Sequence, residues 1–319
     1  MLTLTLKKIL SYARCHGSSS EYDFVTQYLQ PMIKQLGYSF TTDSMGNHYV
    51  KVNDDPILFV AHIDTCHTME ATVVQVLEEK NYYHVANKQV GCLGADDGVG
   101  IYTNLRMIQA GVGGTYLFTV GEEKGLIGAS FIADTMQEWL SSFLMCVEVD
   151  RAGEYEIITH QATGKGASDE FAEALADELD MGHLPSNEGV FTDNSEFNTF
   201  IPECVNVAAG YIHQHTASEK VNFVYVEKLV DQLLKVNWLD LPVVREVTDC
   251  DHGWGLSEWY GNAYDTDDVG VDTEGYPVAN EWDDYVKYVE ANIEKVVYYL
   301  HLHNTSVKDI EHYWKEGEI

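Results

Sequence analysis

Basic residues, paired cysteines and long apolar runs are all scarce in this chain, and each shortage excludes a class of protein. Only 19 lysines and arginines face 51 aspartates and glutamates, which gives a formal net charge of −32. A field of this sign repels nucleic-acid phosphates and anionic lipids, so neither nucleic acid nor membrane is an expected partner. Most of the carboxylates are expected to provide solubility, and attraction of peptides with a free ammonium group is a secondary expectation.

The six cysteines are scattered and form no Cys-x-x-Cys pair. Several of them lie in apolar runs, so we expect reduced, packed thiols of the kind found in cytoplasmic proteins. No apolar stretch is long enough to span a bilayer. The first residues, MLTLTLKKILSYARCHG, lack the uninterrupted apolar core and the cleavage site of a signal peptide. These features predict an intracellular, cytoplasmic protein.

Short apolar runs alternate with helical patterns along most of the chain. The runs PILFVAHID, TYLFTVGEE, FLMCVEVDRAG and VNVAAGYI predict buried strands. Helical spacing covers residues 4–14, 18–36, 98–110, 128–140 and 225–239, and a further helix begins after Ser168. This alternation is typical of an α/β fold with a mixed, mostly parallel central sheet and helices on both faces.

Local signals add detail to this fold. Ser18 and Glu21 form a capping-box pattern at the start of a helix, and Pro31 predicts a kink or break inside that helix. A hairpin is expected to turn at Met45-Gly46-Asn47. Residues 71–90 predict an excursion of two edge strands.

The composition changes near Leu241-Pro242, which divides the chain into a main domain, residues 1–241, and an acidic, aromatic-rich extension, residues 242–319. Asn280 can cap an amphipathic helix near the end of this extension. The segment DTDDVGVDTEG departs from the EF-hand pattern, so a solvated acidic loop is expected there.

Side chains of the kind that bind metals follow several of the apolar runs or lie in the turns between them. They are His62 and Asp64 after ILFVA, Asp96 and Asp97 in GADDGVG, Glu122 and Glu123 after TYLFTVG, Asp150 after FLMCVEV, and His213 and His215 after VNVAAGYI. In an open α/β sheet, the carboxyl ends of the strands meet at a crevice where ligands bind. Histidines with several carboxylates suit zinc, or cobalt or manganese in its place.

A two-metal hydrolytic site needs a bridging ligand, terminal ligands for each ion and a nearby carboxylate that acts as base. Asp96 fits the bridge because it lies where the next helix begins. Successive side chains of a strand point in opposite directions, so Glu122 and Glu123 can divide the roles of base and ligand. Asp64 can orient His62 by accepting the imidazole N–H.

The motifs HID, GADDGVG, GEEKGLIGA, VEVDRAG and YIHQHTASE resemble, in this order, the metal-site motifs of the co-catalytic zinc exopeptidases. These are the M28, M42 and M20 peptidase families, which are phosphorylase/hydrolase-like in fold. The resemblance covers roughly residues 5–240. Only 33 residues (63 to 95) and 64 residues (151 to 214) lie between the relevant motifs, which leaves no room for the inserted domains of M42 and M20 enzymes. The spacing favours a compact, M28-like core.

This resemblance implies an aminopeptidase that acts on peptides with the help of two divalent ions, zinc above all. It implies that Glu122 is the general base and that Asp64 is the catalytic residue that orients a metal ligand. The metal ligands that it implies are His62, Asp96, Glu123, Asp150 and His215. His213 competes with His215 for the last position, and a site-lining role of Asp193 is a further expectation.

Two other functions compete with this one. An N-acyl amino-acid deacylase or a single-metal, glutaminyl-cyclase-like transferase would use the same scaffold. A non-catalytic acidic binding or decoy protein would keep the scaffold without activity. Three other histidines, His67, His160 and His183, are expected to be ordinary surface or loop residues.

Overall fold

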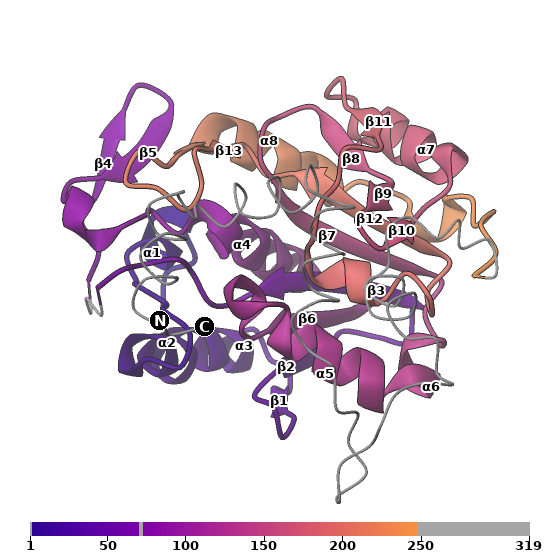
Figure 1. The fold of residues 1–319 in the computed structure, drawn as a ribbon, viewed down its shortest axis with the longest axis horizontal. Helices are drawn as coiled ribbons and strands as arrows, with labels where there is room; N and C mark the ends of the chain where they lie inside the picture. Colours follow the sequence, from indigo (N-terminus) through magenta and orange to yellow (C-terminus); the bar gives the residue numbers. More distant parts are fainter. Residues whose placement is uncertain (1, 70–72, 248–319) are drawn as a thin grey trace, which may run out of the picture. The chain divides into compact units, whose positions relative to one another are not determined.

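An eight-stranded mixed sheet forms the centre of the fold (Figure 1). The computed structural model describes residues 2–69 and 73–247. The strand order is β1 (Thr41–Thr42), β2 (His48–Lys51), β6 (Thr115–Thr119), β3 (Ile57–His62), β7 (Met145–Arg151), β12 (Glu203–Ala208), β8 (Glu156–Ile158) and β11 (Leu184–Ser186). Strands β6, β3, β7 and β12 are parallel, whereas β1, β2 and β8 run antiparallel to their inner neighbours. The four parallel strands therefore bring their carboxyl ends to one edge.

Helices cover both faces of this sheet. Phe59 and Ala61 of β3 belong to one core, which also contains residues of α1 (Leu6–Ile9), α2 (Ser19–Phe24), α3 (Gln30–Gln35), α4 (Ala95–Ala110), α7 (Asp169–Leu179) and α8 (Phe223–Leu233). Leu58 and Val60 belong to the opposite core, with α5 (Ile127–Thr135) and α6 (Gln137–Leu140). Successive side chains of a strand point to opposite faces, so β3 is buried on both. The α/β fold expected from the sequence is confirmed.

A second, four-stranded antiparallel sheet holds the connection that carries His215. Its order is β13 (Tyr211–Ile212), β14 (Lys220–Asn222), β5 (Tyr82–Val85) and β4 (Val76–Glu79). Strands β4 and β5 are the two edge strands expected between His62 and Asp96. The remaining pair, β9 (His160–Gln161) and β10 (Gly164–Lys165), forms a small hairpin. Because β14 pairs with β5, the excursion after β3 supports the connection between β13 and β14.

The strand expected in VNVAAGYI is interrupted. It ends at Ala208 and resumes at Tyr211 in the second sheet. Gly210 has a φ of +81°, a backbone conformation that favours glycine, and a β-carbon there would overlap the ring of Tyr225. The chain can therefore leave the central sheet at this point and direct the following residues towards the carboxyl ends of the strands.

The N-terminal helices differ from the simple spacing prediction. The helix expected over residues 4–14 is limited to Leu6–Ile9, and Arg14 turns inward. Residues 19–35 are helical throughout, with a π-helical segment at Val25–Leu29 that ends just before the turn containing Pro31. Proline has no N–H to donate, which is consistent with a change in the hydrogen-bond pattern beside it. The helix is altered there without being ended.

The predicted helix over residues 128–140 is also divided. It consists of α5 and α6, which are separated by Met136 with a φ of −127°. The helix expected over 225–239 is α8 followed by a short 3-10 turn, Trp238–Asp240. The hairpin turn at Met45-Gly46-Asn47 is present, and the Asp43 carboxylate accepts backbone N–H groups from these three residues.

The first residues of the predicted C-terminal extension are attached to the main domain. The Arg245 guanidinium donates to the carbonyl oxygens of Asn198 and Pro202, both at 2.7 Å. The rest of the extension, including the helix expected after Asn280, lies outside the described residues, and the boundary at residue 241 stays a prediction. Within the described part of the chain, no helix is both long and apolar enough to cross a bilayer.

Arg14 joins three segments beneath the carboxyl edge of the sheet, and its loss should destabilise the fold. The side chain is fully buried and donates to the carbonyl oxygens of Ile63 (2.7 Å), Gly94 (2.9 Å) and Ile9 (3.2 Å). Arg14→Met should lower the free energy of unfolding by about 3 kcal/mol, because buried carbonyl groups lose a charged donor. Urea denaturation measures this loss.

Arg106→Met is the matched control. The Arg106 side chain is 23% exposed and pairs with Glu227 at 3.0 Å on the surface. Such pairs contribute roughly 0–1 kcal/mol, so the control should change the unfolding free energy little. Equal losses of unfolding free energy in the two variants would show that the buried hydrogen bonds of Arg14 stabilise the fold no more than a surface ion pair does.

Candidate metal centre

The Asp96 carboxylate lies between two imidazole rings at the carboxyl edge of the sheet. Its Oδ1 is 2.9 Å from Nε2 of His62, and its Oδ2 is 3.0 Å from Nε2 of His215. His62 ends β3, whereas His215 comes from the connection between β13 and β14. One carboxylate therefore faces two imidazole nitrogens from residues that lie 153 positions apart in the printed sequence. This is the arrangement that a bridging ligand requires.

The first half of the centre contains His62 and Asp150. Oδ1 of Asp150 lies 3.7 Å from Nε2 of His62. The Tyr211 hydroxyl donates to this Oδ1 at 3.0 Å, and the Thr192 hydroxyl donates to Oδ2 at 3.0 Å. These two hydroxyls fix the carboxylate in the orientation that brings it close to His62.

A main-chain contact orients the His62 ring. Nδ1 of His62 lies 3.0 Å from the backbone carbonyl oxygen of Asp64, whereas the nearest carboxylate oxygen of Asp64 is 3.7 Å away. A carbonyl oxygen can only accept, so this contact requires the proton on Nδ1 and leaves Nε2 available for a metal. The expected contact with the Asp64 side chain is thus replaced by one with its backbone.

The second half of the centre contains Glu123 and His215. Oε2 of Glu123 lies 3.1 Å from Nε2 of His215. The thiol of Cys66 belongs to the same cluster, since its sulfur and one ligand atom from each of the other two residues lie within 4.8 Å of one another. His213 lies apart: its side chain is exposed, and its carbonyl oxygen accepts from the Thr216 hydroxyl. The structure therefore brings His215, and not His213, to Asp96.

Glu122 and Glu123 lie on a 3-10 turn, Glu122–Lys124, rather than on a strand end as the alternation argument assumed. Gly121, with a φ of +71°, turns the chain out of β6 just before them. The Asp64 carboxylate holds this turn by accepting the backbone N–H groups of Glu122 (3.1 Å) and Glu123 (3.2 Å). Glu122 reaches to 4.0 Å from Nε2 of His62, while Glu123 faces His215. The two glutamate side chains therefore still point to different halves of the metal centre.

The electrostatics of the centre show an excess of buried negative charge. Burial, with the Asp96 carboxylate beside it, raises the pKa of Asp150 to about 6. Burial also raises the pKa of Glu122 well above its usual range. Burial alone would lower the pKa of His215, but Asp96 and Glu123 outweigh it and raise this pKa to about 11. The donor set of imidazoles and crowded carboxylates thus fits divalent cations, which would neutralise it.

Glu219 supports the segment that carries Asp96. Its two carboxylate oxygens accept the backbone N–H groups of four successive residues, Leu93, Gly94, Ala95 and Asp96, at 2.6–3.1 Å. Asp97, next to the bridge, is buried and accepts from the Gly100 N–H at 2.7 Å. A β-carbon at Gly100 would overlap the Asp97 carboxylate, which explains the glycine at this point of the GADDGVG motif.

Residues 44–201 match the model of peptidase family M28. The chain matches this family, which is part of the co-catalytic zinc exopeptidase group, over just under half of its length. It is a metal-dependent peptidase, as the resemblance of its motifs implied. A comparison with curated protein sequences found no match.

Solved structures of peptidases share the fold of this peptidase. A tripeptidase from Staphylococcus aureus is 17% identical, with a TM-score of 0.59 over 72% of this chain and 95% of the tripeptidase. Aminopeptidase PepT from Bacillus cereus is 16% identical, with a TM-score of 0.56 over 72% of this chain and 95% of its own. The TET1 peptidase from Pyrococcus horikoshii is 18% identical, with a TM-score of 0.51 over 72% and 97% of the two chains.

Sequence reasoning missed several residues that support the centre of the peptidase. Glu219 lies at the end of the YIHQHTASE motif, which gives it no role of its own, and Tyr211 and Thr192 lack any sequence signal. His67 and His183, which were expected to be surface or loop residues, lie in loops but not at the surface. Both are buried, His67 in contact with the Thr65 hydroxyl at 2.6 Å and His183 in contact with the Tyr225 hydroxyl at 2.8 Å.

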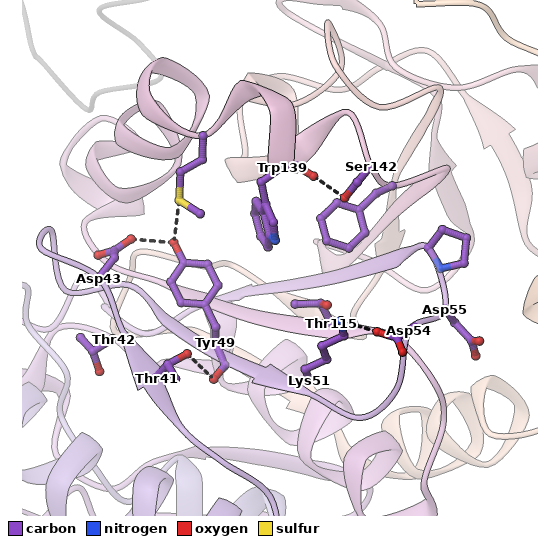
Figure 2. Close-up of a pocket in the computed structure, with 13 residues that line it drawn as sticks. Thr41, Thr42, Asp43, Tyr49, Lys51, Asp54, Asp55, Thr115, Trp139 and Ser142 are labelled. Carbon is purple, nitrogen blue, oxygen red and sulfur yellow. Dashed lines mark hydrogen bonds and ion pairs between the residues drawn. The ribbon is translucent and has the colours of Figure 1, made fainter.

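Asp193, the expected site-lining residue, is fully buried and accepts a hydrogen bond from the Thr119 hydroxyl at the end of β6. It therefore lies behind the carboxyl edge of the sheet. A separate hollow of about 600 Å³ is lined by residues such as Tyr49, Lys51 and Trp139 (Figure 2). None of the predicted site residues borders this hollow, so it lies outside the metal centre.

Glu219→Gln should weaken metal binding by the peptidase. The amide group cannot accept from two of the four N–H groups, so the Asp96 segment loses part of its support. Loss of such support around a ligand typically costs on the order of 10–100-fold in metal affinity. Competition with a chromophoric zinc chelator measures this change.

Glu203→Gln is the matched control for this prediction. Glu203 is also fully buried and accepts from the N–H groups of Ser168, Val244 and Arg245. It begins β12, so it lies at the end of the strand that is away from the metal centre. Both variants should lose stability, but only Glu219→Gln should lose metal affinity. An equal loss of affinity in the two variants would contradict the role given to Glu219.

Chelation of divalent ions should lower the melting temperature of the peptidase, because the crowded carboxylates then repel one another. An ion present at 100–1,000 times its dissociation constant stabilises the folded state by roughly 3–4 kcal/mol. Asp150→Asn removes one of these charges. Scanning calorimetry of the chelated proteins should therefore show this variant melting above the wild type, and the reverse order would refute the electrostatic account.

Proposed function

We propose that this peptidase is an aminopeptidase that holds two divalent ions, most often zinc, and removes N-terminal residues from peptides. The position of Asp96 between His62 and His215 is the observation that carries this proposal. A carboxylate that faces one imidazole with each of its oxygens is suited to bridge two ions. A single-metal transferase would not need the second pair, Glu123 and His215.

In this proposal His62 and Asp150 would hold one ion, Glu123 and His215 would hold the other, and Asp96 would be shared between them. Divalent ions bound here would activate water and polarise the scissile carbonyl group. The chain itself must then position the substrate and move a proton. Asp64 contributes by holding the turn that carries both glutamates, through hydrogen bonds to their backbone N–H groups.

Glu122 is the proposed general base. Its carboxylate lies 4.0 Å from Nε2 of His62, and its side chain is 14% exposed, so it borders the centre without being sealed from substrate. A base in this position accepts the proton of the attacking water and passes it to the departing amine. Burial, the first cause of its raised pKa, also makes the carboxylate a stronger base.

A preference for a free N-terminus follows from the net charge of the chain, which is −32. Two divalent ions would balance the four carboxylates of the centre itself, so the acidic residues outside the centre would attract the ammonium group of a free N-terminus. An acylated N-terminus lacks this charge. Among the proteins of similar fold, one is an aminopeptidase and another is a tripeptidase.

Glu122→Gln should lower kcat by on the order of 10²–10⁴-fold, because the amide cannot accept the proton. The metal content should stay at the wild-type level, since Glu122 is not a proposed ligand. Glu123→Gln is the comparison variant and should lose metal as well as activity. Hydrolysis of aminoacyl-arylamides with parallel metal analysis measures both effects, and full turnover by Glu122→Gln would overturn the mechanism.

Comparison of substrates separates the aminopeptidase from a deacylase on the same scaffold. Aminoacyl-arylamides and short peptides should be cleaved, whereas the same compounds with an acetylated N-terminus should not. Faster release of acyl groups from N-acylated amino acids would favour the deacylase. If well-folded protein carried no metal and cleaved neither class, the proposed function would be wrong.

A further inference from the structure

We propose that Cys66 is an additional ligand of the ion held by Glu123 and His215, which makes this half of the centre selective for thiophilic metals. The inference builds on the two-metal function proposed above and adds a ligand that the motif comparison does not contain. It assigns different ligand chemistries to the two halves.

The first argument is the position of the thiol. The Cys66 sulfur, a Glu123 oxygen and a His215 nitrogen lie within 4.8 Å of one another. Ligand atoms that share a tetrahedral zinc ion lie about 3.5 Å apart, as follows from metal–ligand bond lengths of about 2.0–2.3 Å. The three groups are thus close enough to converge on one ion after small side-chain movements.

The second argument is that the backbone on both sides of Cys66 is fixed. The Thr65 N–H donates to the carbonyl oxygen of Arg14 at 2.9 Å, and the Thr65 hydroxyl contacts the His67 ring at 2.6 Å. Thr65 and His67 are both buried, whereas Cys66 between them is half-buried and reaches the metal cluster. The neighbours therefore pack inward while the thiol faces the centre.

The third argument is an unsatisfied carboxylate oxygen in the same cluster. The Glu123 side chain is only 6% exposed, and its Oε2 faces His215. Its other oxygen, Oε1, is buried and has no hydrogen-bond partner among the described residues. A buried carboxylate oxygen without a donor is costly, and a cation shared with the thiol and the imidazole would satisfy it.

The chemistry of the two halves then differs. His62, Asp150 and Asp96 offer nitrogen and oxygen alone, whereas a thiolate adds a soft ligand to the other half and favours zinc, cadmium or cobalt over manganese. Binding breaks the S–H bond and forms a metal–sulfur bond, and the thiol proton passes to the solvent. No oxidation state changes in this step.

Cobalt titration of the metal-free full-length chain tests the assignment, because a thiolate bound to Co²⁺ gives a charge-transfer band in the near ultraviolet. The band should appear in the wild type as the Glu123–His215 half fills. It should be lost in Cys66→Ser, while the visible bands of bound cobalt remain. Zinc affinity at one of the two sites should fall by at least about 10-fold, the lower bound expected even for groups that only support a ligand.

Cys15→Ser is the matched control. Cys15 is half-buried like Cys66, but its thiol donates to the His67 carbonyl oxygen at 2.8 Å and is not part of the cluster. This variant should keep the charge-transfer band. Bound cobalt without the band in the wild type, or a band that survives in Cys66→Ser, would overturn the inference while leaving the two-metal function intact.

A measurement on the unaltered chain covers the case in which Cys66→Ser does not fold. Iodoacetamide should alkylate Cys66 in the metal-free protein, and zinc should protect it, as read by peptide mass spectrometry. Cys15 serves as the internal reference and should react equally in both states. Equal alkylation of Cys66 with zinc bound would refute the assignment, and a chain that binds neither zinc nor cobalt would refute both this inference and the proposed function.

Discussion

Repulsion between buried carboxylates is the constraint on which the rest of this centre depends. Asp96, Asp150, Glu122 and Glu123 meet around two histidines at one edge of the sheet. Carboxylates in such proximity cannot all stay ionised in a dry environment unless positive charge neutralises them. The protein supplies part of the compensation itself. Two hydroxyl groups donate hydrogen bonds to Asp150, and two imidazole rings lie beside Asp96. Divalent ions are the natural source of the rest, which is why the ligand set and the charge excess point to the same conclusion.

The same constraint explains the dense hydrogen bonding of the loops around the centre. Asp64 accepts two N–H groups of the turn that carries Glu122 and Glu123, and Glu219 accepts four N–H groups of the segment that leads to Asp96. Each of these acids lies behind a proposed metal ligand rather than among the proposed ligands. Loops held in this way cannot move away from each other to relieve the repulsion between the carboxylates, so the centre is preorganised for cations.

The sequence was informative wherever position along a strand decides where a side chain lies. His62 and Asp150 lie at carboxyl ends of parallel strands, and apolar runs mark those ends in any α/β sheet. The order of the motifs therefore predicted which segments meet. It did not predict how Glu122 and Glu123 separate, because Gly121 takes a positive φ and converts the expected strand end into a 3-10 turn. The two side chains do diverge, but from a turn and not from the strand end that the alternation of side chains assumes.

Other features depend on contacts between segments distant in the chain, which local patterns do not contain. The choice between His213 and His215 follows from the turn between β13 and β14, which directs one ring to Asp96 and the other to solvent. Cys66 is one of six scattered cysteines without a Cys-x-x-Cys pair, so the sequence predicted only a reduced, packed thiol there. Its position beside Glu123 appears only when β3 and β6 lie next to each other in the sheet.

The extreme acidity of the chain has a smaller share in this chemistry than its net charge of −32 suggests. Exposed charges are screened beyond roughly 8 Å at physiological ionic strength, so most of the 51 acidic residues act on solubility and long-range attraction. The few carboxylates beneath the surface are screened far less, and among the described residues several of them lie close enough together to share an ion. Composition therefore indicates the sign of the charge that a partner carries, whereas burial and orientation of the carboxylates decide where the partner binds. In this peptidase the decisive negative charges are those that folding removes from water.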